Sequence, residues 1–277
     1  LQYIGDDVDQ LYYKDVLSLV INKQAIENQK DKLSIVYTPL HGSGNKPVRH
    51  VLGELGISKL AVAKEQEMPY PEFPTVSAPN PEQPDAFRLA IPLANEVGAN
   101  MILGTDPDCD RLGVVVRDHN NEFKVLTGNQ IGCLLLDYIL SQKQSSFQGD
   151  EFVVKSIVST PMAVTIANHY GVELRDVLTG FKFIAEQIKL SEESGKGHFL
   201  FGFEESYGFL SGTFVRDKDA CIASMLVTEM TCYYAEQGMT LYDALCALYA
   251  KYGYFKEKVL SKTLSGIEGI AKIKAAV

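Results

Sequence analysis

Three aspartates stand at every second position between two apolar runs in the stretch ILGTDPDCDRLGVVV, residues 102–116. In an extended strand, alternate residues lie roughly 7 Å apart, too far for three carboxylates to share one ion. Pro107 cannot continue a hydrogen-bonded ladder, so we expect a turn that brings Asp106, Asp108 and Asp110 together. Gathered carboxylates repel each other unless a cation lies among them, and Arg111 supplies a single positive charge. The spacing therefore predicts a divalent-cation site.

The chemistry of these ligands indicates which ion they suit. Carboxylate oxygens without a nearby set of His or Cys residues favour magnesium. An EF-hand needs Gly at its sixth position and Glu at its twelfth, but counting from Asp106 these positions hold Arg111 and Arg117. The EF-hand is thereby excluded. The alternative without a metal is a solvated acidic turn, which the apolar strands on either side disfavour because unpaired carboxylates are costly to bury.

Two further loops carry groups that suit a sugar. GFKF at 180–183 and GFEESYGF at 202–209 each follow a predicted strand, where the ligand crevices of open α/β sheets lie. Glu204, Glu205 and Ser206 offer acceptors and donors for hydroxyl groups. A glycosidase pair is disfavoured because neighbouring glutamates cannot easily flank a bond from two faces. A serine nucleophile is disfavoured because GFEESYG lacks the Gly-x-Ser-x-Gly elbow, and the remaining alternative is a polar loop with a capping serine.

Basic groups lie near the same predicted strand ends. They are Lys155, Lys182 and the segment RDKD at 216–219. Each alone is compatible with a solvated side chain, but a phosphate ligand would explain their convergence. The segment HGSGNK at 41–46 is rich in glycine but is not a Walker A loop. For His41, an approach to a ligand and a place in a capped turn are both compatible with the sequence.

Composition bounds the class of protein. The 277 residues, 46% of them hydrophobic, allow two domains of ordinary size. A net charge of −9 argues against nucleic acid or an anionic membrane as partner. The five cysteines include no Cys-x-x-Cys pair, and the sequence contains no signal peptide and no apolar run of membrane-spanning length, so we expect a cytoplasmic protein. Because the chain starts at Leu1 without a methionine, we expect it to be an excised piece.

Apolar periodicity predicts alternating strands and helices, and hence two tandem three-layer α/β/α domains with mixed, mostly parallel sheets. In the first half we predict helices over 9–29, 46–55 and 85–97, strands over 33–40, 59–64, 100–105 and 113–118, and an extended Pro-rich loop over 69–84. In the second half we predict strands over 152–159, 172–177 and 198–204, and helices over 126–140 (capped by Thr127 or Asn129), from Pro161, after Gly180 and over 217–237. A strand over 252–264 and a C-terminal helix follow.

These elements predict a domain boundary near residue 127. The predicted metal-binding domain spans 1–127, and the predicted sugar-binding domain spans 128–252. Residues 253–277 are predicted to start a truncated C-terminal domain.

The motifs GTDPDCDR, TGFKF, GFEESYG and RDKD, in this order, resemble those of the α-D-phosphohexomutases, the phosphoglucomutase and phosphomannomutase group. The resemblance covers essentially the whole chain. It implies that a phosphoserine donates its phosphoryl group to a hexose monophosphate and that the resulting bisphosphate turns over in the site. It also implies Mg²⁺ held by Asp106, Asp108 and Asp110 together with a phosphoserine oxygen, with Arg111 beside the transferring phosphate.

The same resemblance implies where the hexose phosphate and hexose bisphosphate bind. Glu204 and Ser206 would grip two sugar hydroxyls, so that either end of the substrate occupies the same place. The further residues implied around the sugar are Thr179, Gly180, Lys155, Lys182 and Lys218. The loops that grip hydroxyls are shared by glucose and mannose enzymes, so they do not specify the epimer, nor do they specify an oligomeric state.

Two parts of the family pattern are not matched. Family members have four domains, and neither the Ser-His-Asn-Pro loop of the first nor the phosphate-binding loop of the last occurs here. Ser77 in SAPNP lies in the Pro-rich loop before the metal strand and is not taken as the nucleophile. The chain thus resembles the two middle domains, and alone it is expected to be inactive.

Two alternatives stay open. A haloacid-dehalogenase-type phosphatase would use Asp106 as its nucleophile, but such enzymes usually place Thr or Val where this chain has Asp110. The chain also shows no convincing acidic pair after a downstream strand. A non-catalytic protein that binds sugar phosphates is the second alternative.

Overall fold

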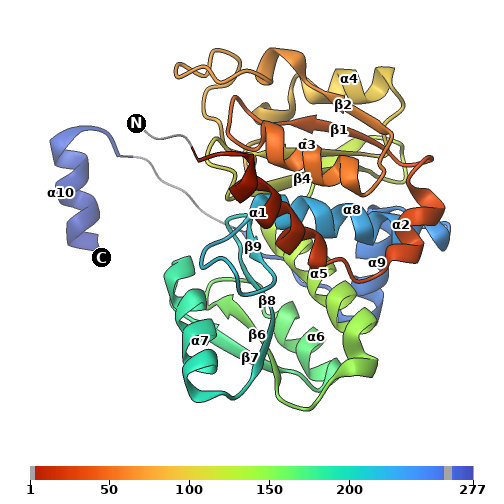
Figure 1. Cartoon of the computed structure of the whole chain (residues 1–277). Coiled ribbons are helices and arrows are strands. Elements are labelled where there is room, and N and C mark those ends of the chain that lie inside the picture. The colour runs from red at the N-terminus through yellow and green to blue at the C-terminus, as the bar shows by residue number, and fades with distance from the viewer. Residues whose placement is uncertain (1–3, 259–263, 277) are drawn as a thin grey trace.

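The computed structural model describes residues 4–258 and 264–276. It contains two β-sheets, each between layers of helices, so the predicted α/β class with mixed, mostly parallel sheets is confirmed (Figure 1). Within the described ranges no helix is long and apolar enough to cross a membrane.

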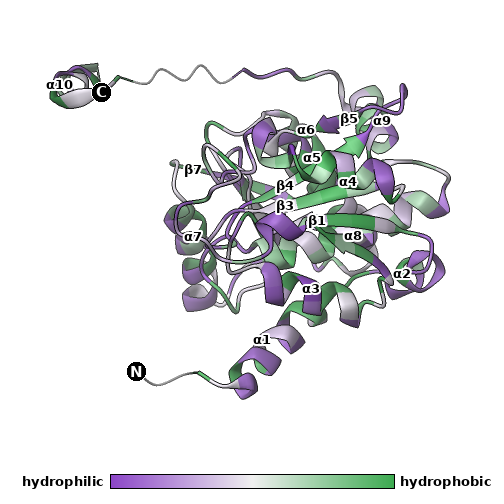
Figure 2. Ribbon diagram, turned by 90° about the horizontal axis from the view of Figure 1, so that it is seen from above, coloured by the Kyte–Doolittle hydropathy of each residue, from purple (hydrophilic) through white to green (hydrophobic). Residues whose placement is uncertain are grey.

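The first sheet has the strand order β2-β1-β3-β4-β5. Its strands are β1 (Ser34–Thr38), β2 (Lys59–Val62), β3 (Met101–Thr105), β4 (Leu112–Arg117) and β5 (Phe123–Val125). β4 pairs antiparallel with β3 and β5, while β1 pairs parallel with β2 and β3. Every residue of β1 and β3 is buried, which accounts for the mainly apolar residues of these strands and for their hydrophobic colour in the centre of Figure 2.

Alternation along the strands supplies two apolar faces. Val36 and Ile102 pack in the cluster beneath α4 (Ala90–Glu96), whereas Ile35 and Leu103 point into the main core. α3 (Asn45–Glu54) also contributes its apolar face to that core.

The second sheet has the order β7-β6-β8-β9, with β9 antiparallel to β8. Its strands are β6 (Glu151–Ser156), β7 (Glu173–Val177), β8 (His198–Glu204) and β9 (Gly208–Leu210). α7 (Phe181–Ser194) lies on one side, with α6 (Met162–Tyr170) and α5 (Gly128–Lys143) on the other (Figure 1). Of the two predicted caps, Thr127 is the one that caps α5, by accepting the N–H of Gln130 at 3.2 Å.

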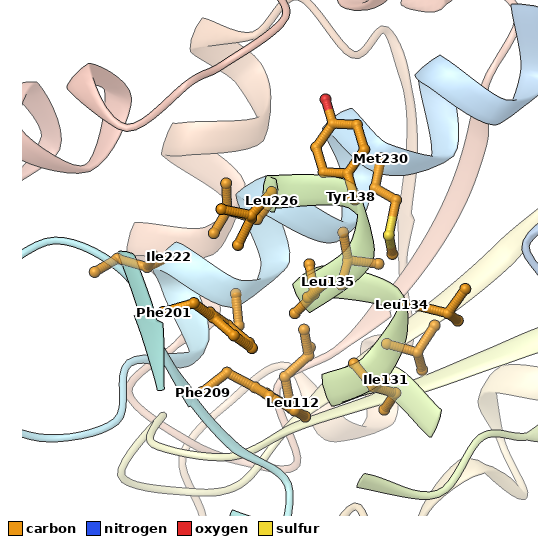
Figure 3. Close-up of a cluster of buried hydrophobic side chains, with 14 of the residues drawn as sticks. Leu112, Ile131, Leu134, Leu135, Tyr138, Phe201, Phe209, Ile222, Leu226 and Met230 are labelled. Carbon is orange, nitrogen blue, oxygen red and sulfur yellow. The ribbon is translucent and has the colours of Figure 1, made fainter. Parts of the chain in front are cut away.

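One buried apolar cluster runs through both sheets. Figure 3 shows Leu112 of the first sheet near Phe201 and Phe209 of the second, with Leu135 of α5 and Leu226 of α8 (Ala220–Glu236) beside them. α8 follows the second sheet in sequence but packs against α2 (Lys23–Gln29) and α3. The two sheets are therefore joined by shared helices as well as by the chain.

Several predicted elements differ from the structure. The helix over 9–29 is two helices, α1 (Asp6–Ser18) and α2, because the buried Glu229 carboxylate accepts the N–H groups of Ile21 (3.0 Å) and Asn22 (2.7 Å) between them. The helix over 85–97 is a 3₁₀ turn, Pro84–Phe87, followed by α4. β5 and α9 (Leu241–Tyr252) were not predicted.

The C-terminal predictions have mixed outcomes. In the strand predicted over 252–264, residues 253–258 adopt no regular structure and residues 259–263 lie outside the described residues. The final predicted helix is present as α10 (Gly266–Ala276), drawn away from both sheets in Figures 1 and 2.

Candidate functional site

The aspartate motif forms a tight loop between β3 and β4. Oxygens of Asp106, Asp108 and Asp110 all lie within 4.8 Å of one another. The Oδ1 atom of Asp106 accepts the backbone N–H groups of Asp110 (3.0 Å) and Arg111 (2.9 Å), and Cys109 takes a left-handed conformation at φ 59°. The predicted curl is thus present, and it is held by a carboxylate of the motif itself.

The electrostatics of this loop favour a cation. Burial, together with the charges of the neighbouring Asp110 and Asp108, raises the pKa of Asp106 to about 7 against the lowering effect of the Arg111 N–H. The donor set consists of carboxylate oxygens, which suit magnesium. A divalent ion among these oxygens would favour the ionised form of Asp106, which burial disfavours.

The HGSGNK segment supports the aspartate loop from one side. A Cβ atom on Gly42 would lie 2.5 Å from the Cα atom of Pro107, and the N–H of Ser43 donates to the Pro107 carbonyl at 2.8 Å. Both ring nitrogens of His41 are engaged at 2.8 Å, by the Met68 carbonyl and the Thr75 hydroxyl. Of the two interpretations of this histidine, the structure supports the capped turn.

Arg111 is surrounded by carboxylates. Its Nη1 atom lies 2.5 Å from Glu82 Oε1, and its Nε atom lies 3.8 Å from both Asp106 Oδ2 and Asp110 Oδ1. Glu82 belongs to the Pro-rich segment and is not among the predicted site residues. Its spacing of 29 residues from Arg111 gave no local signal.

Backbone hydrogen bonds join the aspartate loop to the GFEESYG loop. Arg111 forms a β-bridge with Gly208, and the N–H of Leu112 donates to the Tyr207 carbonyl at 3.0 Å. Gly128, at the start of α5, is needed for close packing here because its Cβ atom would lie 2.1 Å from the Glu205 carbonyl oxygen. The structure therefore brings the two motifs together, although they are about 95 residues apart.

The predicted sugar-binding residues form a second group beside this junction. Oε1 of Glu204 accepts the N–H of Gly180 at 2.7 Å, which ties the TGFKF loop to the GFEESYG loop. Burial raises the pKa of Glu204, although the Gly180 N–H opposes the shift. Gly180 has φ 120°, a conformation that other residues rarely adopt. Thr179 is exposed and Ser206 is half-buried, so both are accessible to a ligand.

The three predicted lysines lie in different settings. Lys218 Nζ is 2.6 Å from Asp110 Oδ2 and its stem packs over Gly208, so it contacts both loops. Lys155 is buried, 2.6 Å from Asp176 Oδ1 and bonded to two backbone carbonyls. Lys182 is exposed, with its Nζ atom 5.0 Å from the centre of the Phe183 ring.

An open cleft of about 630 Å³ lies beside this arrangement. Its walls include Ser43, Asp108, Asp110, Arg216 and Lys218. Carboxylates of the kind that bind metals and basic side chains of the kind that bind phosphates therefore line the same cleft.

Comparison with known proteins places these features in a family. Residues 10–120 match the family described as phosphoglucomutase/phosphomannomutase, alpha/beta/alpha domain II, and residues 127–252 match domain III. The chain is 35% identical over 275 residues to the phosphoglucomutase of Staphylococcus saprophyticus, covering 99% of this chain and 49% of that protein. The Staphylococcus epidermidis phosphoglucomutase is 39% identical over 272 residues, with 98% and 48% covered.

Solved structures share the fold at lower identity. A phosphoglucomutase/phosphomannomutase family protein from Burkholderia thailandensis matches with a TM-score of 0.62 and 17% identity, covering 89% of this chain and 53% of that one. The Aspergillus fumigatus N-acetylphosphoglucosamine mutase in complex with GlcNAc-6P and magnesium matches with a TM-score of 0.57 and 16% identity, covering 87% and 53%. The chain spans about half the length of the curated relatives, and it belongs to the phosphoglucomutase/phosphomannomutase family, with matches to the α/β/α domains II and III of that family.

Proposed function

We propose that this chain is the central part of a phosphohexomutase that interconverts hexose 1-phosphate and hexose 6-phosphate through a phosphoserine enzyme and a bisphosphate. The observation that carries this proposal is the β-bridge between Arg111 of the aspartate loop and Gly208 of the GFEESYG loop, beside which Lys218 pairs with Asp110 and packs its stem on Gly208. A site for a metal and a phosphate thereby adjoins a site for sugar hydroxyls. The names of the curated relatives support the same activity.

Magnesium is the proposed cofactor, and Asp106, Asp108 and Asp110 would hold it. Their oxygens are close enough to converge on one ion, and hard oxygen donors are the ligands that magnesium prefers. When bound, the ion would neutralise charge on the phosphoryl group during transfer. The serine that carries this group is proposed to lie outside the chain.

The chain's own residues would position the substrate. Arg111 and Lys218 would donate hydrogen bonds to phosphate oxygens, since both cations lie beside the aspartate loop. Glu204 and Ser206 would bind two sugar hydroxyls. The proposed lining of the sugar site is Thr179, Gly180, Lys155 and Lys182.

Binding through the sugar hydroxyls would explain how one site serves both directions of the proposed reaction. Because it recognises hydroxyls rather than one particular phosphate, a bisphosphate can present either end to Arg111 after it has turned over. Hexose phosphates and hexose bisphosphates are therefore the proposed ligands.

The five cysteines are free thiols, which supports the proposed cytoplasmic location.

A test of the activity uses glucose 1-phosphate with the purified chain in Mg²⁺. We expect the chain to bind the sugar phosphate, detected by calorimetry, without forming glucose 6-phosphate or releasing inorganic phosphate. The complete gene product should form glucose 6-phosphate. Release of phosphate by the chain would instead support the phosphatase, and a complete product that binds glucose 1-phosphate without converting it would support a non-catalytic binding protein.

A further inference from the structure

Glu82 lies in the Pro-rich segment over 69–84, to which the proposed function assigns no role. Its backbone is held in place by neighbouring contacts: the Asn80 side chain accepts the Glu82 N–H at 2.9 Å. Pro81 packs so closely on β4 that a Cβ atom on Gly113 would lie 2.8 Å from the Pro81 Cβ atom. The segment therefore presents the Glu82 carboxylate from a fixed position on the first sheet.

That carboxylate contacts one side of the Arg111 guanidinium. Nη1 lies 2.5 Å from Glu82 Oε1, and each of the two side chains is 33% exposed. Nε faces Asp106 and Asp110 at 3.8 Å. Among residues 4–258 and 264–276, Nη2 of Arg111 donates no hydrogen bond, so the guanidinium keeps donors for a ligand while Nη1 and Nε face carboxylates.

The charge of Glu82 also acts on the GFEESYG loop. Burial raises the pKa of Tyr207 in the GFEESYG loop, and the nearby charge of Glu82 raises it further. The Tyr207 carbonyl in turn accepts the N–H of Leu112, next to Arg111. Glu82 thus lies where the Pro-rich segment, the aspartate loop and the GFEESYG loop meet.

We propose that Glu82 is a positioning residue that orients Arg111 toward the transferring phosphate and keeps it oriented when a metal occupies the aspartates. The proposal rests on the proposed function, which places a phosphate beside Arg111. A bound divalent ion would share the charge of Asp106 and Asp110, which weakens their hold on the guanidinium. Glu82 is not one of the three clustered aspartates and so stays available to Arg111.

The test measures the access of a small reagent to Arg111. The chain is treated with phenylglyoxal in saturating Mn²⁺, and labelling of the Arg111 peptide is followed by mass spectrometry in wild type, Glu82→Gln and Glu82→Asp. We expect Arg111 labelling to rise about threefold to fivefold in both variants, the factor that corresponds to loss of a partly exposed ion pair. Glu72→Gln, an exposed glutamate of the same segment, is the matched control and should leave labelling unchanged.

Two internal references make the result specific. Arg117, which stacks on the Phe123 ring at 4.0 Å, reports general loosening of the first sheet and should keep its labelling. In the complete enzyme, Glu82→Gln should lower kcat roughly 10-fold with little change in KM, as expected for a residue that orients a transition-state contact. Unchanged Arg111 labelling in both Glu82 variants, or a rise at Arg117 equal to that at Arg111, would overturn the proposal.

The labelling test of Glu82 and the metal-binding test of the proposed function can fail independently of each other. Mn²⁺ should still bind to Glu82→Gln, because the three clustered aspartates do not include Glu82. If wild type binds no Mn²⁺, the metal site of the proposed function fails, while the labelling contrast between Glu82→Gln and Glu72→Gln in the metal-free chain still tests the contact with Arg111.

Discussion

At the scale of single residues, the three aspartates differ in what surrounds them. Asp106 is buried and uses Oδ1 to hold the loop, Asp110 pairs with Lys218, and Asp108 is exposed. Each therefore has its own set of contacts, although the sequence presents them as equivalent. Substituting Asp110 removes one proposed ligand without removing the two hydrogen bonds that shape the loop.

The first prediction follows from this difference. Asp110→Asn should weaken Mn²⁺ binding about 10-fold or more, since a neutral amide replaces a charged ligand and a tenfold change is only about 1.4 kcal/mol. The measurement is a titration followed by electron paramagnetic resonance. Asp7→Asn, in the exposed first turn of α1, is the control. Equal affinity in Asp110→Asn and wild type would show that Asp110 is not a ligand.

The second prediction concerns Gly180. Gly180→Ala places a side chain at φ 120° and should destabilise the fold by about 1–3 kcal/mol. It should also weaken glucose 1-phosphate binding, because relief of the strain at φ 120° shifts the backbone N–H of residue 180 that holds the Glu204 carboxylate. Gly53→Ala is the matched control. Gly53 lies in α3 with open space around its Cβ position, so this substitution should stabilise the fold by about 0.5–1 kcal/mol. Urea unfolding measures both, and a neutral Gly180→Ala would contradict the strain argument.

The residues of the candidate site differed in how far the sequence revealed them. The aspartates lie at alternate positions of one short segment, Glu204 ends β8, and Gly180 follows β7, so pattern and topology predicted their proximity. Glu82 and His41 act through contacts with segments 27 to 34 residues away, inside or against an irregular loop. Irregular loops have no period from which such contacts can be inferred.

At the scale of elements, the strands and caps that depend on residues nearby in the sequence were predicted well. Uniformly buried strands such as β3 have continuous apolar sequences, and Thr127 caps α5 through a bond three residues away. The break between α1 and α2 has a distant cause, since Glu229 of α8 accepts N–H groups 207 and 208 residues away. Short β5, with half-buried and exposed residues, carried too weak a pattern for prediction.

The third prediction tests this distant contact through pH. Burial raises the pKa of Glu229 above its ordinary value of 4.5, and the Tyr138 hydroxyl and the backbone N–H groups offset only part of the shift. Because the folded state holds this proton more tightly than the unfolded state, the contribution of Glu229 to stability falls as pH rises from about 4.5 through its folded pKa. Glutamine cannot ionise, so Glu229→Gln should gain stability relative to wild type over that range.

Urea unfolding at several pH values from 4 to 8 measures this difference. Glu96→Gln, at an exposed position near the end of α4, is the control and should show a difference from wild type that does not grow with pH. A stability difference between Glu229→Gln and wild type that stays constant, or shrinks as pH rises, would contradict the assigned direction of the pKa shift.

At the scale of the whole molecule, the proposed division near residue 127 separates two sheets that share their covering helices. α8 lies in the second segment of the sequence but packs on α2 and α3 of the first. The apolar cluster of Figure 3 likewise draws on both segments. Two matched family domains therefore need not be two independently stable ones.

The last prediction follows from this shared core. Residues 1–127 made alone would lack α8 and α5 and would expose one apolar face of the first sheet, including Leu112 and Leu103. We expect this piece to bind a hydrophobic dye and to unfold without a sharp transition, whereas the whole chain should show coincident near- and far-ultraviolet circular dichroism transitions. A chain of residues 1–258, which keeps both sheets and α8, should unfold at the same urea concentration as the whole chain. A cooperative transition in residues 1–127 would instead show that the first sheet is stable without α8, and the two proposed sites would then lie on separately folding domains.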